Sequence, residues 1–200
     1  SFREALDIPD GRVENTWEHR LKVAQVIRRT RPRVVILPYW KGRHPDHYTA
    51  SKLGYEACFL AGLAKLNIER ALGSDPAFSQ VASAMASVVA GEPQDSAASQ
   101  PHRPFKIIYA SLYYDIRPTF VVDITDQFET RFQSLMAYKT QFSDQQAGKD
   151  IFPAQAEIRS RVESMARFYG MLAGVTFAEP FVQNEVGMIE DVTAIPVKSI

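Results

Sequence analysis

The sequence predicts an α/β fold in which a mostly parallel sheet is flanked by helices. An amphipathic helical pattern over residues 17–29 leads into a short apolar run at 34–38, and a second helical pattern follows over 50–66. An uninterrupted run rich in β-branched residues is typical of a strand that is covered on both faces. Because helix, buried strand and helix alternate along the chain, we expect neighbouring strands to be parallel.

The first half of the chain carries clear element boundaries. Asn15 and Glu18 have the spacing of a capping box, and apolar residues then recur at helical intervals. Pro32 ends this helix. A group of arginines closes the helix and suits the negative end of its dipole (Arg28, Arg29, Arg31 and Arg33).

The second half begins with a change of composition. Residues 73–104 are rich in Ser, Ala, Gln, Gly and Pro, and we interpret them as an insertion within one domain that spans 1–200. Four further elements follow: strands over 105–114 and 119–125, which we expect to pair as a C-terminal hairpin, and helices over 127–141 and 154–172. A short extended segment at 175–181 comes last.

Composition excludes several classes of function. The chain has 200 residues and is 46% hydrophobic, enough for a substantial core. Lys plus Arg and Asp plus Glu balance at 23 each, so no strong field favours nucleic acid or an anionic membrane. The single Cys58 excludes an internal disulfide, and no apolar stretch has the length of a membrane span. We therefore expect a cytoplasmic protein.

The candidate site is the run Arg43-His44-Pro45-Asp46-His47, which lies between the predicted strand and helix. In open α/β sheets, ligands bind at the carboxyl ends of the strands. Imidazole can ligate zinc or transfer protons near neutral pH, and Asp46 can cap the helix or orient an imidazole. A zinc site needs three protein ligands, so these residues alone leave open a polar loop without function.

The segment "VVILPYWKGRHPDHYTASKL" resembles the second signature of the LmbE-like (PIG-L type) zinc-dependent N-deacetylases. Other segments resemble family elements in the same order: "LDIPDGRVENTWEHRLKVAQVIRRTRPRVV", "PHRPFKIIYASLYYDIRPTFVVDIT", "LMAYKTQF" and "GVTFAEPF". Within the family the resemblance is strongest to the bacillithiol branch, which deacetylates N-acetylglucosaminyl malate. It implies a Rossmann-like fold, a small amino-sugar substrate and a homo-oligomer.

The resemblance also implies roles for individual residues. His47 would be a zinc ligand, while His44 paired with Asp46 would transfer protons and stabilise the oxyanion. Three further residues would lie at the substrate pocket: Arg43, Asp10 and Arg12. The implied reaction is metal-assisted hydrolysis of an N-acetyl group.

Two departures from the family pattern qualify this prediction. The family's first signature, Ala-His-Pro-Asp-Asp, supplies the remaining zinc ligands, and this sequence does not contain it. We expect the opening strand and that signature to precede Ser1, so that this chain binds zinc weakly, has little activity and exposes apolar surface. Ile158 stands where some members have a supporting tyrosine. The alternative function is a non-catalytic binding or assembly module that lacks a complete metal site.

Overall fold

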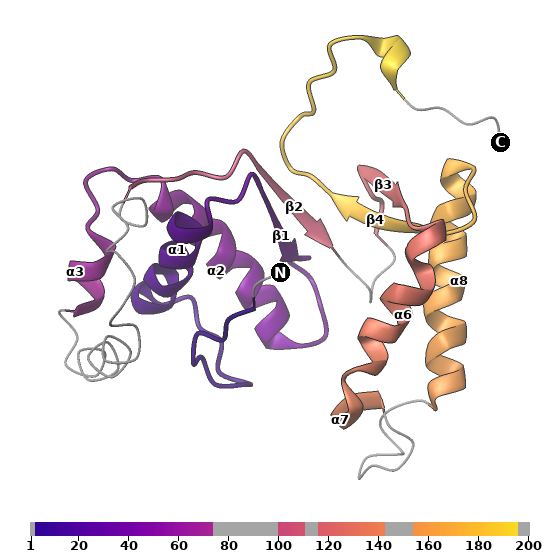
Figure 1. Ribbon diagram of the computed structural model, residues 1–200, viewed down its shortest axis with the longest axis horizontal. Helices are drawn as coiled ribbons and strands as arrows, with labels where there is room; N and C mark the ends of the chain where they lie inside the picture. Colours follow the sequence, from indigo (N-terminus) through magenta and orange to yellow (C-terminus); the bar gives the residue numbers. More distant parts are fainter. Residues whose placement is uncertain (1–2, 74–99, 111–115, 143–153, 196–200) are drawn as a thin grey trace, which may run out of the picture. The chain divides into compact units, whose positions relative to one another are not determined.

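The computed structural model describes residues 3–73, 100–110, 116–142 and 154–195 (Figure 1). The chain divides into two compact units, Ser1–Ile116 and Arg117–Ile200. Each unit combines two paired strands with helices, which confirms the predicted α/β class. Most of the predicted insertion at 73–104 lies outside the described residues.

The first unit places helices beside a parallel pair of strands. In chain order its elements are α1 (Trp17–Thr30), β1 (Val34–Pro38), α2 (Pro45–Ala61), α3 (Ile68–Gly73) and β2 (Lys106–Ala110). β1 and β2 run parallel, with Val34 opposite Lys106 and Pro38 opposite Ala110. The parallel pairing that the helix-strand-helix order predicts is therefore confirmed.

The core of this unit lies between its helices and one face of the strand pair. Val35 of β1 and Ile107 of β2 pack against a buried cluster from α1, α2 and α3. That cluster contains Leu21, Ala24, Ile27, Ala57, Cys58, Leu60, Ala61, Ile68 and Leu72. The helices thereby fix the position of the loop that joins β1 to α2.

β1 is covered on one face, so the prediction of a strand buried on both faces is wrong. Leu37 is 8% exposed, whereas Val34 and Ile36 are 45% and 59% exposed. Successive side chains of a strand point to opposite faces, and Val34 and Ile36 share the face opposite to Val35. The continuous apolar run identified the strand but did not show how much of it the chain covers.

Arg28 binds backbone carbonyls at and beyond the end of α2, a role that its position in the arginine group did not predict. Its guanidinium is buried and donates hydrogen bonds to the carbonyl oxygens of Ala61, Leu63 and Leu66 at 2.7–2.9 Å. Desolvation lowers the pKa of Arg28. The side chain satisfies carbonyls at and beyond the end of α2, instead of only compensating the dipole of α1.

The start of α1 differs from the predicted capping box. Thr16 is the N-cap, and its hydroxyl accepts a hydrogen bond from the His19 amide at 3.1 Å. The helix begins one residue later than a cap at Asn15 would require. The Oδ1 atom of Asn15 is buried and has no hydrogen-bond partner among the described residues.

The second unit contains an antiparallel pair of strands with helices. Its elements are β3 (Phe120–Asp123), the 3-10 turn η1 (Thr125–Gln127), α6 (Phe128–Met136), α7 (Lys139–Phe142), α8 (Gln155–Ala173), β4 (Ala178–Val182) and η2 (Val192–Ala194). β3 pairs antiparallel with β4, with Phe120 opposite Phe181. The predicted hairpin of 105–114 with 119–125 is therefore wrong, because β2 pairs with β1 and β3 with β4.

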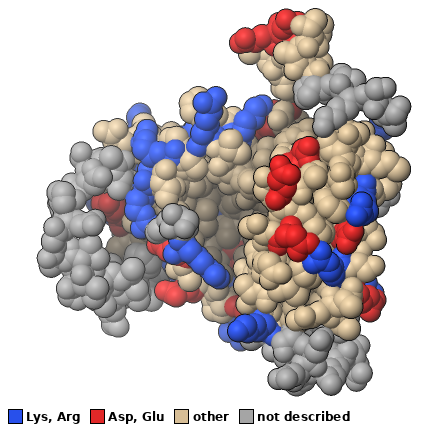
Figure 2. All heavy atoms as spheres, turned by 45° about the vertical axis from the view of Figure 1, so that its right-hand side comes forward, with Lys and Arg blue, Asp and Glu red and all other residues tan. Residues whose placement is uncertain are grey.

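The helices of the second unit match the predicted positions closely. α8 corresponds to the predicted 154–172 helix and ends at Gly174, whose φ of +68° suits glycine. The predicted 127–141 helix is divided into α6 and α7. Acidic and basic side chains lie next to one another on this unit (Figure 2), including the ion pairs Arg159–Glu129, Arg161–Glu157 and Arg167–Glu163. No helix in the described ranges is long and apolar enough to cross a membrane.

Candidate functional site

The candidate site lies on the loop that leaves the carboxyl end of β1 and enters α2. The Tyr39 amide donates to the Ala110 carbonyl at 2.8 Å, so the pairing with β2 continues one residue beyond β1. The loop then runs through residues 40–44, and Pro45 occupies the first turn of α2. Pro45 has no amide hydrogen to leave unsatisfied there. The strand and the helix thus hold both ends of this short loop.

His44 is the N-cap of α2, so the prediction that Asp46 caps the helix is wrong. The Asp46 amide donates to Nδ1 of His44 at 3.2 Å. Pro45 restrains His44 to an extended backbone, with φ −90° and ψ 126°, which suits a cap. Because Nδ1 uses its lone pair as an acceptor, the neutral ring carries its proton on Nε2. His44 therefore presents an N–H donor, and not a second lone pair, at Nε2.

The Asp46 carboxylate fastens a distant loop to the start of α2. It accepts hydrogen bonds from the amides of Gly11, at 2.7 Å, and Val13, at 3.2 Å. The side chain is buried, and a carboxylate in the first turn also favours the positive end of the helix dipole. Gly11 has a φ of +72°, a backbone conformation that favours glycine. The contact between Asp46 and His44 is made by the Asp46 amide, while the Asp46 carboxylate binds this loop.

This attachment places Asp10 close to His44 and Asp46. Asp10, His44 and Asp46 each offer one potential ligand atom, and these atoms lie within 4.8 Å of one another. Carboxylate oxygens keep a second lone pair when they accept one hydrogen bond, so both aspartates fit a divalent cation. The His44 ring, as it lies, does not supply a further donor lone pair. The three residues therefore form part of a metal shell at most.

His47 and Arg43 lie beside this group on the same short stretch. The His47 side chain is exposed in the first turn of α2, and its ring centroid lies 5.3 Å from that of His44. Arg43 is exposed immediately before His44, and Arg12 is exposed on the loop that Asp46 holds. Asp10, His44 and Asp46 are thus brought together from two segments about 30 residues apart in sequence, and this group of ligand atoms does not include the predicted zinc ligand His47.

Three residues outside the loop have other surroundings. Ile158 is 7% exposed within α8 of the second unit, and its apolar side chain cannot donate a hydrogen bond. The His19 ring contacts the Glu14 carbonyl and the His102 ring contacts the Pro32 carbonyl, each at 2.8 Å. Both histidines therefore serve local structure.

Sequence reasoning missed one feature of the loop, an aromatic group around Trp40. Its ring centroid lies 4.2 Å from that of Tyr39 and 4.8 Å from that of Tyr109 on β2. The adjacent aromatic residues in "PYWKGR" were a signal for this group, but the contribution of Tyr109 depends on a strand pairing that no local pattern indicates.

Comparisons with known proteins show which proteins this chain resembles. The sequence profile of the GlcNAc-PI de-N-acetylase family (PIG-L) matches residues 2–58, which include both loops of the site. Diacetylchitobiose deacetylase from Thermococcus kodakarensis is 28% identical over 179 residues, covering 88% of this chain and 54% of the relative. The chain therefore spans about half the length of this relative.

Solved structures share the fold. A conserved protein from Thermus thermophilus matches with a TM-score of 0.68 and 30% identity, over 95% of this chain and 69% of that one. N,N'-diacetylchitobiose deacetylase from Pyrococcus horikoshii gives 0.55 and 23%, over 90% and 54%. The 4-carboxy-2-hydroxymuconate hydratase from Pseudomonas putida gives 0.61 and 16%, over 94% and 67%. At these lower identities the last two likenesses show the fold alone.

Proposed function

We propose that this chain is a member of the PIG-L/LmbE-like deacetylase family, which these matches support. On this premise, the protein hydrolyses the N-acetyl group of an amino-sugar conjugate with the help of a bound zinc ion. The observation that carries the proposal is the juxtaposition of Asp10, His44 and Asp46 at the carboxyl end of β1. Two oxygen donors and an imidazole N–H at one place are the groups that metal-assisted amide hydrolysis uses.

The chain's own residues divide into metal-binding and proton-donating groups. His47 is the proposed metal ligand, since Nδ1 of His44 is engaged by the Asp46 amide. When bound, the metal would polarise the acetyl carbonyl and activate a water molecule. His44 would stabilise the carbonyl oxygen through Nε2–H. It would provide a proton for the departing nitrogen only as an imidazolium, in which Nδ1 carries a proton and no longer accepts from the Asp46 amide. Asp46 would hold His44 through its amide and the Asp10 loop through its carboxylate.

The charge around the loop supports an anionic conjugate, with N-acetylglucosaminyl malate of the bacillithiol pathway as the proposed substrate. Arg43 and Arg12 are exposed on the two segments that meet at Asp46. Guanidinium groups bind carboxylates in a bidentate manner, which suits the malate group. The relative from Thermococcus kodakarensis has an uncharged substrate by its name, so hydrolysis of diacetylchitobiose and of the malate conjugate should be compared.

Substitution of the two loop histidines tests the proposed division of roles. In the whole protein, His47→Ala should abolish zinc binding and turnover, while His44→Ala should lower the rate and leave zinc bound. His19→Ala, which removes a ring that contacts the Glu14 carbonyl, is the matched control and should change neither. Zinc content and acetate release are measured for each variant. Equal loss of zinc in both loop variants would refute the division.

One observation favours a second candidate, the non-catalytic binding module. Among the described residues, the group of possible metal ligands at the loop contains one imidazole, that of His44. Its Nδ1 already accepts a hydrogen bond from the Asp46 amide, so this group does not make a complete metal site. A whole protein that releases no acetate and binds no zinc, yet binds N-acetylated sugars, would favour the module. A cytoplasmic location and a homo-oligomer complete the proposal, and light scattering of the purified protein tests the latter.

A further inference from the structure

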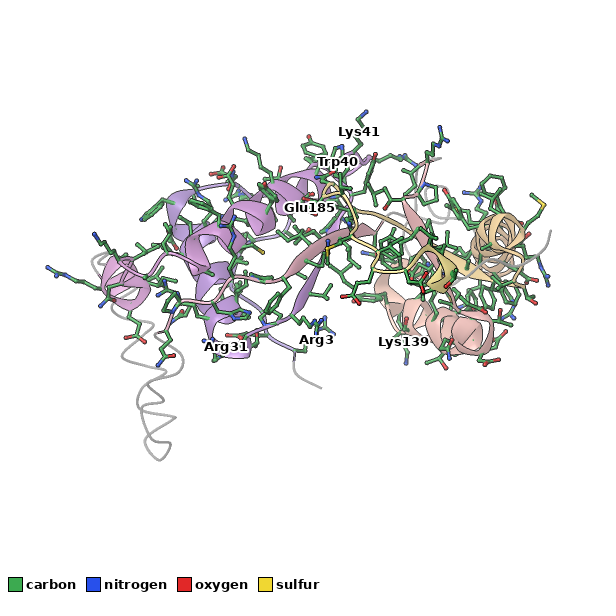
Figure 3. All side chains as sticks on the ribbon, turned by 90° about the horizontal axis from the view of Figure 1, so that it is seen from above. Arg3, Arg31, Trp40, Lys41, Lys139 and Glu185 are labelled. Atoms are coloured by element: carbon green, nitrogen blue, oxygen red, sulfur yellow. The ribbon has the colours of Figure 1, made fainter. Side chains whose placement is uncertain are left out.

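Trp40 is a large aromatic side chain on the candidate loop that the proposed reaction does not use. It lies two residues after β1 and four before His44. Its ring centroid is 4.2 Å from that of Tyr39, with planes inclined by 34°, and 4.8 Å from that of Tyr109, nearly at right angles. Figure 3 shows Trp40 and Lys41 next to each other at one edge of the first unit.

The Trp40 ring is both held in place and accessible. Tyr109 is 4% exposed and belongs to a paired strand, so it provides a fixed support. Trp40 itself is 36% exposed. A ring that is already ordered loses little conformational entropy when a ligand packs on it. The chain thus offers a rigid apolar surface at the carboxyl end of β1, where ligands of α/β sheets bind.

The neighbours of Trp40 define the chemistry of a ligand that would suit this surface. Lys41 and Arg43 are exposed on the same loop and carry several N–H donors, and His44 adds the Nε2–H group. A pyranose ring has C–H groups on its faces and hydroxyl groups around its rim. The C–H groups can pack on the negative face of an indole, while the hydroxyl groups bind polar neighbours.

We propose that Trp40 forms a sugar-stacking subsite, in which the indole packs against the pyranose ring of the N-acetylated amino sugar. This inference rests on the proposed function for the identity of the sugar. Trp40 would be a binding residue that places the acetyl group at His44 and Asp10. It would take no part in bond breaking.

The two tryptophans of the chain give a direct optical test with a matched control. Trp17 lies on α1, is 48% exposed and has the Arg20 guanidinium 5.7 Å from its ring. In this 200-residue chain the Trp17→Phe variant leaves Trp40 as the sole tryptophan, and its emission should change when N,N'-diacetylchitobiose is added. The Trp40→Phe variant leaves Trp17, and its emission should stay constant.

Calorimetry with the same disaccharide measures the size of the effect. Trp40→Ala should weaken binding about tenfold, whereas Trp40→Phe should retain most of the affinity, because it keeps an aromatic face. Trp17→Ala should bind like the parent protein. The thermal transition of each variant is recorded, and the Trp40→Phe variant keeps the test valid if loss of the ring unfolds the protein.

The outcomes separate this inference from the proposed function. Sugar binding that changes Trp40 emission, together with no acetate release by the zinc-loaded whole protein, would refute the hydrolytic function and support the subsite. Acetate release and sugar binding that are unchanged in Trp40→Ala would overturn the subsite and leave the function intact. Absence of any disaccharide binding would also overturn the subsite.

Discussion

Removal of the Asp46 carboxylate should release the loop of residues 10–13 from α2. In Asp46→Ala, the amides of Gly11 and Val13 lose an acceptor that lies 2.7 Å and 3.2 Å away, respectively. Hydrogen bonds to a charged group contribute about 1.5–3 kcal/mol each. Gly11 is exposed and water can replace the carboxylate there, so we expect a combined loss of about 2–3 kcal/mol in the free energy of unfolding.

Hydrogen exchange detects this change at the two amides. The free energy of opening the loop should fall by the same amount, and exchange of the Gly11 and Val13 amides should accelerate roughly 30-fold to 150-fold. Asp46→Asn keeps one oxygen acceptor and should give an intermediate effect. Asp10→Ala removes the neighbouring carboxylate and should leave both amides protected. Unchanged exchange in Asp46→Ala would refute the assigned contact and, with it, the placement of Asp10.

Three further changes test the packing that supports the site. Arg28→Ala should lower the free energy of unfolding by about 3–5 kcal/mol, because three carbonyls lose a charged donor, whereas Arg29→Ala removes a surface ion pair and should cost under about 1 kcal/mol in urea titrations. Burial raises the pKa of Cys58 to about 11, so its thiolate forms more readily in the unfolded chain than in the folded one. The difference in the free energy of unfolding between the parent protein and Cys58→Ala should therefore be constant below pH 9. Between pH 9 and pH 11 the parent protein should lose up to about 3 kcal/mol relative to that variant. A pH-independent difference in chemical denaturation would contradict this. Gly170→Ala should destabilise the second unit by about 2 kcal/mol or more, since its Cβ would lie 2.7 Å from two backbone oxygens, whereas Gly73→Ala meets nothing within 4 Å; equal melting temperatures for the two variants would contradict the packing around α8.

Local patterns predicted the order of the elements well, because helices and buried strands have their own hydrophobic periods. The 34–38 strand, the loop after it and the 154–172 helix are examples that the structure contains. Strand partners were harder to predict, since β3 pairs with a strand more than 50 residues further along the chain. The short predicted connection at 115–118 favoured a hairpin, but the pairing depends on packing that local sequence does not encode.

In the candidate site too, features of neighbouring residues were predictable, whereas contacts between residues distant in sequence were not. The run from Arg43 to His47 was a candidate because its residue types have metal-binding and proton-transfer chemistry, and the resemblance to a family signature favoured a site over a polar loop. The helix cap was misassigned because Asp is a common N-cap, whereas here His44 fills that position through its ring. The Asp46 contacts with Gly11 and Val13 join residues 33–35 positions apart, and only the fold reveals them.

The central claim is that the β1–α2 loop serves a metal-dependent amide hydrolase. The most direct test is acetate release from N-acetylglucosaminyl malate and N,N'-diacetylchitobiose by the whole protein, with zinc and after chelation. We predict release that requires zinc, returns when zinc is restored and is lost in His47→Ala. Release that persists after complete removal of metal, or no release from either substrate by the zinc-loaded protein, would contradict the claim.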